Sequence, residues 1–149
     1  MKRHWNILAA LCALFLLIAV GCTAGYEEDY AVRIDVTAKT AEPVYSITLA
    51  YGPEGDVRAS SSVMNADGTA IQDACTFGWT AEELSGLPDR EAVEVTVSIT
   101  TEPGDAAAEQ TVATALLSMA DGRAYDFTIE GSAADGYRLT VQQQSRPEA

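Results

Sequence analysis

The chain of 149 residues is poor in histidine and in basic side chains. Its one histidine, His4, lies in an N-terminal segment that we expect to be removed from the mature protein. A domain without histidine lacks the usual general base, the Ser-His-Asp and Cys-His nucleophile systems, and histidine-based zinc or copper sites. The sequence therefore excludes the commonest hydrolase and metalloenzyme designs.

Cysteine is also scarce, with only Cys12, Cys22 and Cys75 in the chain. Loss of the N-terminal segment removes Cys12, and Cys22 has another role, described below, so no internal disulfide framework can form. We expect Cys75 to be a small buried apolar side chain. The neighbouring Asp73 works against a reactive thiolate.

The first 22 residues have the pattern of an export signal. Basic residues at positions 2 and 3 precede an apolar run of 16 residues, Trp5 to Val20, shorter than the roughly 20 that a membrane-spanning helix needs. The run ends in Val20-Gly21-Cys22, which resembles the bacterial lipoprotein signal, with Ala19 where leucine is usual.

The resemblance implies cleavage between Gly21 and Cys22 and attachment of a diacylglycerol to the Cys22 thiol. The membrane would then be the first partner of the protein, through the lipid on Cys22, at the extracytoplasmic face of the cell membrane. Two alternatives are cleavage after Ala24, which releases a soluble protein, and a short uncleaved anchor.

The mature chain is strongly acidic. Of 9 basic residues, Lys2 and Arg3 leave with the signal, so 7 remain against 22 acidic ones, a net charge of −15. Phosphate backbones repel such a domain, and no basic cluster offsets the repulsion. The sequence therefore excludes nucleic acid as a partner and predicts a domain that stands off anionic lipid.

Most of the mature chain alternates apolar and polar residues with a period of two, which is typical of half-buried strands. The clearest example is Val93 to Thr100. The same alternation, or a shorter run bounded by turns, indicates strands over 32–37, 45–51, 57–64, 75–79, 111–119, 125–129 and 137–141. The pattern predicts an all-β fold: a single antiparallel β-sandwich, immunoglobulin-like or similar, of seven to eight strands.

The domain boundaries follow from this pattern. We expect a signal helix over residues 1–21, the lipidated cysteine and a short tether over 22–29, the sandwich over 30–144 and a frayed tail over 145–149. Asp-Gly pairs at 67–68, 121–122 and 135–136 predict tight turns. Thr80 and Glu83 have the spacing of a capping box and predict one helical turn.

Two candidate sites come with competing structural interpretations. Asn65, Asp67 and Asp73 surround a turn and supply oxygen ligands suited to calcium, but EF-hand spacing is absent, and a turn that bonds its own backbone is favoured. Trp79 is the candidate for ligand contact; the alternative is an apolar plug over one end of the sandwich.

The sequence thus predicts a membrane-anchored lipoprotein whose domain is a non-catalytic binding or structural module with a protein or glycan partner. It indicates no enzyme activity, cofactor or metal. The alternative is a carbohydrate-binding or carboxylate-dependent, glycan-active surface protein. An interaction module should show an exposed edge strand or an aromatic patch, whereas an enzyme should show a pocket with converging carboxylates, one with a raised pKa.

Overall fold

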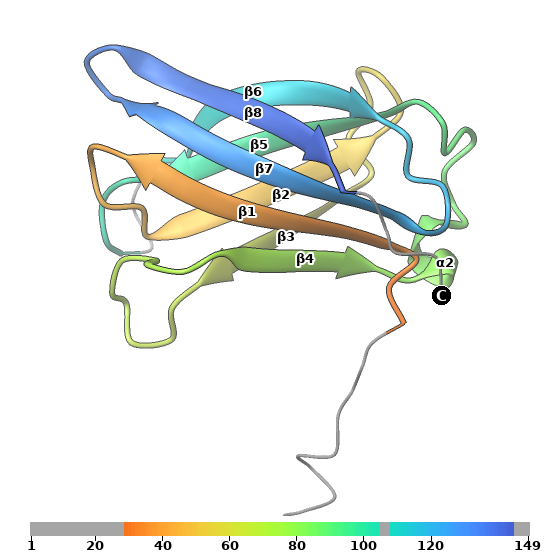
Figure 1. Ribbon diagram of the computed structural model, residues 1–149, viewed down its shortest axis with the longest axis horizontal. Coiled ribbons are helices and arrows are strands. Elements are labelled where there is room, and N and C mark those ends of the chain that lie inside the picture. Colours follow the sequence, from red (N-terminus) through yellow and green to blue (C-terminus); the bar gives the residue numbers. More distant parts are fainter. Residues whose placement is uncertain (1–28, 105–107, 145–149) are drawn as a thin grey trace, which may run out of the picture.

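The computed structural model describes residues 29–104 and 108–144, which form two four-stranded β-sheets packed face to face (Figure 1). The elements in chain order are β1 (Val32–Thr40), β2 (Ser46–Gly52), β3 (Ala59–Met64), β4 (Cys75–Trp79), α2 (Ala81–Leu84), β5 (Val93–Thr100), β6 (Gln110–Leu117), β7 (Arg123–Ser132) and β8 (Gly136–Gln143). The predicted signal helix, the cleavage site at Gly21 and Cys22, and the tail over 145–149 lie outside the described residues.

One sheet has the strand order β4-β1-β7-β8 and the other β3-β2-β5-β6. The all-β sandwich of eight strands with one short helical turn is confirmed. The prediction that all strands are antiparallel is wrong for one pair, because β1 and β7 run parallel over nine paired positions, from Val32 with Arg123 to Thr40 with Gly131.

The parallel pair follows from the path of the chain. β1 enters its sheet at the end of the sandwich next to α2 and leaves for the other sheet after Thr40. β6 ends beside the start of β5, at that same end, so β7 also starts there (Figure 1). Two neighbouring strands that enter one sheet from the same end are necessarily parallel.

The core lies between the sheets and is built by the alternation seen in the sequence. Along β5, Val93, Val95, Val97 and Ile99 are fully buried, while the residues between them face outward. Every buried apolar side chain of the described core lies between Val32 and Ile129, so the described residues by themselves enclose one contiguous apolar core.

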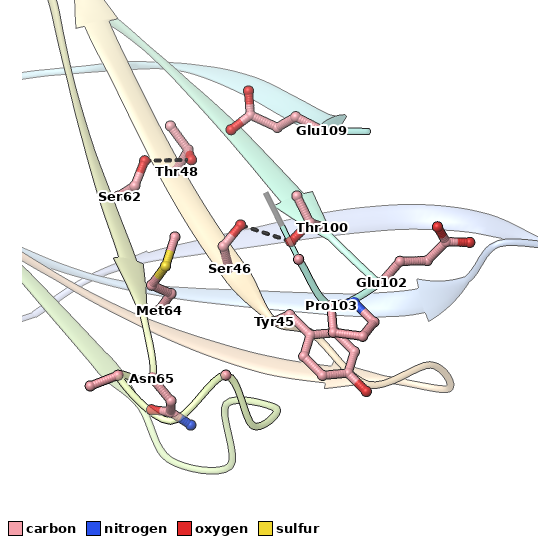
Figure 2. A pocket seen from close by; sticks show the side chains of 13 residues that line it. Tyr45, Ser46, Thr48, Ser62, Met64, Asn65, Thr100, Glu102, Pro103 and Glu109 are labelled. Carbon is pink, nitrogen blue, oxygen red and sulfur yellow. Dashed lines mark hydrogen bonds between the residues drawn. The ribbon is translucent and has the colours of Figure 1, made fainter. Parts of the chain in front are cut away.

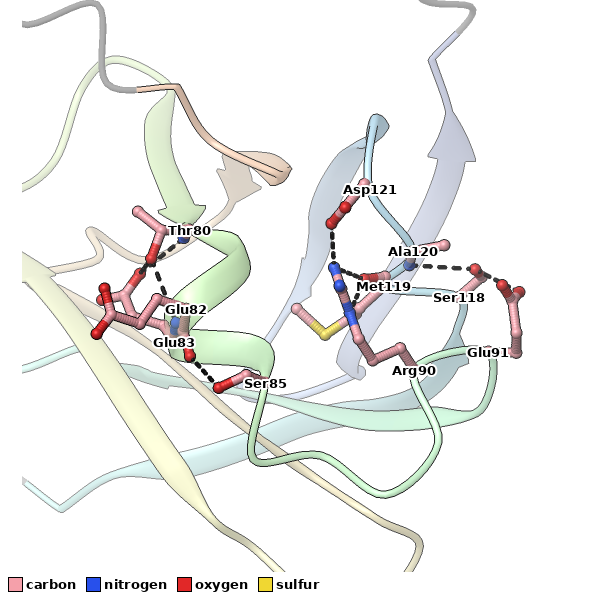
Figure 3. Close-up of polar contacts among 10 residues, drawn as sticks. All are labelled: Thr80, Glu82, Glu83, Ser85, Arg90, Glu91, Ser118, Met119, Ala120 and Asp121. Atoms are coloured by element: carbon pink, nitrogen blue, oxygen red, sulfur yellow. Dashed lines mark hydrogen bonds and ion pairs between the residues drawn. The ribbon is translucent and has the colours of Figure 1, made fainter.

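The predicted turns and helical turn are confirmed. Gly68, Gly122 and Gly136 have φ of 73°, 87° and 87°, a region that side chains disfavour. At α2, the Glu83 amide donates to Thr80 Oγ1 at 3.3 Å and the Thr80 amide donates to Glu83 Oε2 at 2.7 Å (Figure 3). Among the described residues, no helix is long and apolar enough to cross a membrane.

A second set of contacts holds the segment after α2 against the β6–β7 connection. Arg90 donates to the Met119 carbonyl from Nε at 3.0 Å and from Nη2 at 2.7 Å, and Nη2 also contacts Asp121 Oδ1 at 2.7 Å (Figure 3). The Tyr125 hydroxyl donates to the Ser118 carbonyl at 2.6 Å. These bonds satisfy loop carbonyls that would otherwise lose hydrogen-bond partners beside the core.

Asp35 joins the strands of the first sheet on its outer face. Its carboxylate accepts hydrogen bonds from Thr76 on β4 at 2.6 Å, from Arg33 at 3.0 Å and from Gln144 beyond β8 at 3.3 Å. Partial burial acts to raise the pKa of Asp35, but these hydrogen bonds and the Arg33 charge outweigh it, so the pKa lies below its usual value of 3.8.

We expect Asp35→Asn to lower the free energy of unfolding at pH 7 by about 1 kcal/mol, because charge-assisted hydrogen bonds are lost. A depressed carboxyl pKa contributes stability that is complete above the unfolded value of 3.8 and disappears as the pH falls through the lower folded value. The difference in unfolding free energy between the wild type and Asp35→Asn, measured by urea titration, should therefore narrow below about pH 4. Glu130→Gln, an exposed change on β7, is the control. If the difference in unfolding free energy between the wild type and Asp35→Asn stays constant down to pH 2, the role assigned to the Asp35 carboxylate is contradicted.

Gly131 closes the β7–β8 hairpin with φ of 110°, and a Cβ there would overlap the Gly136 carbonyl oxygen. We expect Gly131→Ala to lower the free energy of unfolding by about 1–3 kcal/mol, because both the backbone and its neighbour are strained. Gly86→Ala is the matched control, since a Cβ at that position meets nothing within 4 Å. Equal thermal denaturation midpoints for the two variants would contradict the prediction.

Candidate functional site

β3 is an exposed edge strand of the second sheet. Among the described strands it pairs with β2 alone, and its six residues Ala59–Met64 carry no charge and no proline. Only Val63 is half-buried, while the other five residues are exposed. Alternate N–H and C=O groups of such a strand face away from the sheet and can pair with another chain.

The other three edges are better protected. β6 and β8 lie close together where the two sheets meet along one side of the sandwich. β8 also carries Arg138, and the β5–β6 pairing is interrupted by a register shift after Val97. On β4, three of the five side chains are buried, so this edge offers fewer exposed side chains for recognition than β3 does. β3 has none of these features, so it is the edge most open to a further strand.

A hollow of about 480 Å³ lies on the outer face of the second sheet, beside the end of β3 (Figure 2). Its lining comes from three separate segments of the chain: the start of β2, the end of β3 with the turn after it, and the β5–β6 connection. The side chains that matter here are Tyr45, Ser46, Thr48, Ser62, Met64, Thr100, Glu102 and Glu109.

Hydroxyl groups make the floor of this hollow. Ser46 and Thr100 are joined at 2.8 Å, and Thr48 and Ser62 at 2.7 Å (Figure 2). Ser46 is only 8% exposed, and its bond to Thr100 satisfies its hydroxyl. The hydroxyl surface continues toward β6, where Thr96 bonds Thr114 at 3.0 Å. The floor is polar, uncharged and built on paired strands, which makes it a rigid surface.

Charge and apolar surface meet at the rim. Glu102 and Glu109 line the hollow, and none of its described lining residues is basic. Met64, the last residue of β3, is 63% exposed and also lines it. The hollow is therefore an acidic depression with an exposed thioether on the side of the open strand edge.

Trp79 does not contribute to a surface. It is 3% exposed, its ring meets Tyr51 edge-on at 5.4 Å, and it stacks on Phe77 at 6.4 Å. The structure thus places Trp79 in the core, next to α2, as an apolar plug at that end of the sandwich. Its ring is not available for ligand contact. Tyr51 and Tyr125 are also buried, and Tyr45 and Tyr137 are half-buried.

The Asn65–Asp73 region has the contacts of a turn. Asp67 Oδ1 accepts from the Thr69 hydroxyl at 2.6 Å and from its amide at 3.1 Å, which lowers the pKa of Asp67. The Asn65 amide donates to the carbonyls of Thr69 and Ala70 at 3.2 and 3.0 Å. Among the described residues, no group of three or more histidine, cysteine or acidic side chains is placed to hold a metal ion.

Cys75 is buried at the start of β4. Burial raises the pKa of its thiol, and the Asp73 charge raises it further. Both effects disfavour the thiolate, which is the reactive form. This agrees with the expectation of a small buried apolar side chain.

Glu42 is a carboxylate that joins loops rather than one prepared for proton transfer. The Ala133 amide donates to its Oε1 at 3.0 Å and the Tyr137 hydroxyl to its Oε2 at 2.8 Å, and these bonds lower the pKa of Glu42. For Asp35, Glu42 and Asp67, the described carboxyl groups with a clear pKa shift, the shift is downward. A general acid at neutral pH needs the opposite shift.

No protein-family model matches the chain, and neither does any curated protein sequence. Among solved structures, a crystal structure from Bacteroides fragilis, provisionally described as a cell adhesion protein, is similar to 81% of this chain and to 47% of its own, with 18% sequence identity and a TM-score of 0.35. This chain therefore spans about half the length of that protein. Values this low do not define a shared family or function.

Proposed function

We propose that the protein is an extracytoplasmic lipoprotein, held in the cell membrane by lipid on Cys22, whose β-sandwich is a non-catalytic interaction module. The anchor rests on the basic start, the apolar run and the Val20-Gly21-Cys22 ending of the chain. Two or three acyl chains hold a protein in a bilayer far better than one does.

The observation that carries the interaction role is the open edge of β3. An uncharged edge strand of six exposed or half-exposed residues is a liability in a protein that has no use for it, since it invites pairing with other chains. Recognition by strand addition uses such an edge: backbone hydrogen bonds provide affinity, and alternate side chains provide specificity.

A glycan-binding role is the second candidate. The half-buried Tyr45 and the carboxylates Glu102 and Glu109 line one hollow, a combination that sugar-binding sites also use. Against it, Trp79 lies in the core, and Tyr45 is the one aromatic side chain among the described lining residues of the hollow.

The anchor is tested by comparing two cysteine variants of the full chain. We expect the wild type and Cys75→Ser to enter the detergent phase of a phase-separation assay, with an N-terminal peptide that starts at a diacylated Cys22. Cys22→Ser removes the lipid-bearing thiol and should leave the detergent phase or remain an uncleaved precursor. An unmodified wild-type chain that starts at Gly25 rules the anchor out.

The interaction role is tested by photo-crosslinking on intact producing cells. A benzophenone side chain placed at Ser61, an exposed residue of β3, should yield a discrete crosslinked protein. The same side chain at Thr140, exposed on the edge strand β8, is the matched control and should yield none. Equal crosslinking at both positions, or crosslinking at neither, contradicts a partner on β3.

A further inference from the structure

We infer that the segment recognised along β3 is an extended basic peptide of a partner protein, which adds as a fifth strand to the second sheet and directs its lysine or arginine side chains toward the acidic hollow. This inference rests on the interaction role proposed above and specifies the chemistry of the partner. The inferred binding site consists of the free edge of β3 and the hollow beside it.

The geometry follows from the spacing of strands. An added strand lies about 4.8 Å from β3, and its alternate side chains point to the same face as those of β3. On the outer face these neighbours are Ser60, Ser62 and Met64, and the last two also line the hollow. A long side chain from the added strand therefore extends across β3 toward the hydroxyl floor.

The sign of the partner charge follows from what surrounds this edge. Glu102 and Glu109 line the hollow, and no described lining residue is basic. In the part of the chain that the structure describes, the one basic residue next to β3 is Arg58, which is already paired with Asp56 at 2.7 Å. Complementary charge steers association and disfavours wrong partners, so a cationic segment is preferred over a neutral or acidic one.

A second copy of this chain is a poorer occupant. Two copies of the mature chain each carry a net charge of −15, 7 basic against 22 acidic residues, which opposes association. An antiparallel pairing of two β3 strands would also bring together the acidic residues that flank the strand at its two ends, Asp56 and Asp67. Like charges close to one another add to the repulsion between two copies.

Apolar contact supplements the charge. Met64 is 63% exposed at the end of β3, and its flexible thioether adapts to different neighbouring side chains. The aliphatic stem of a lysine or arginine can cover this apolar surface while its charged head points across β3 into the hollow, on whose far side Glu102 and Glu109 lie. Basic side chains fit this combination of an exposed methionine and an acidic rim better than short polar ones do.

The test uses the chain that starts at residue 23, which keeps the whole described core. The probe is a capped peptide of about eight residues in which lysine alternates with valine, the length of an ordinary strand. We expect it to bind in fluorescence anisotropy and to slow hydrogen exchange at β3 but not at β4. Its affinity should fall as the salt concentration is raised. The same peptide with glutamate for lysine, and one N-methylated at every second residue, should not bind.

Paired protein variants separate the hollow from the general acidity of the surface. Glu102→Gln/Glu109→Gln should weaken binding of the lysine peptide by about fivefold, because two charges that attract the lysines across the hollow are lost. Glu82→Gln/Glu130→Gln removes the same charge from exposed positions on α2 and β7 and should weaken binding less than twofold. Equal effects of the two pairs, or binding without protection of β3, would mean non-specific attraction and would overturn the inference.

The remaining outcomes distinguish this inference from the proposed function. If the glutamate peptide or a neutral one protects β3 from hydrogen exchange, the inference that the partner segment is basic is overturned, but the proposed interaction role remains. Dimers in sedimentation with β3 protected make a second copy the occupant. A glycan-array signal that Glu102→Gln/Glu109→Gln abolishes makes the hollow a sugar site. If none of the peptides or glycans binds and the benzophenone at Ser61 gives no crosslink, the proposed interaction role itself is overturned.

Discussion

The parallel pairing of β1 with β7 is the contact on which the architecture depends. Nine consecutive positions pair across these two strands, at the centre of the sheet β4-β1-β7-β8. Without it, that sheet would separate into the pairs β1–β4 and β7–β8, and the core side chains Ile34 and Phe127 would lose their neighbours. The pair also joins the beginning of the domain to its end, so folding must close a long loop before this contact can form.

The sequence predicted the strands better than their arrangement. Alternation between apolar and polar residues shows which side chains face the core, and it located all eight strands to within a few residues. Alternation does not specify the neighbour of a strand or its direction. β1 and β7 alternate as antiparallel strands do, because each has one face on the core and one exposed to water. Their direction depends on the path of the connections, which leaves little local signal.

The candidate site was less accessible to sequence reasoning. The hollow combines residues from three segments between Tyr45 and Glu109, and the β2–β3, β2–β5 and β5–β6 registers bring them together. Trp79 drew attention because exposed aromatic residues often bind ligands, but its position opposite Val32 places it in the core. One local signal was present: Ser60-Ser61-Ser62 supplies no apolar residue on either face, which is typical of an edge strand rather than a central one.

The anchor proposed at Cys22 and the edge of β3 impose compatible constraints on orientation. The described chain begins at Asp29, beside α2, and the last strand ends at the same end of the sandwich (Figure 1). The hollow lies at the other end, where β2 begins and where β3 and β5 finish. A tether of seven residues reaches at most about 25 Å, and an anionic bilayer repels an acidic domain. With the proposed anchor, the short reach of the tether would keep the α2 end nearest the membrane and the free edge of β3 farther from it. Charge repulsion acts on the whole acidic domain, Glu82 and Glu83 of α2 included, and would keep it off the bilayer surface.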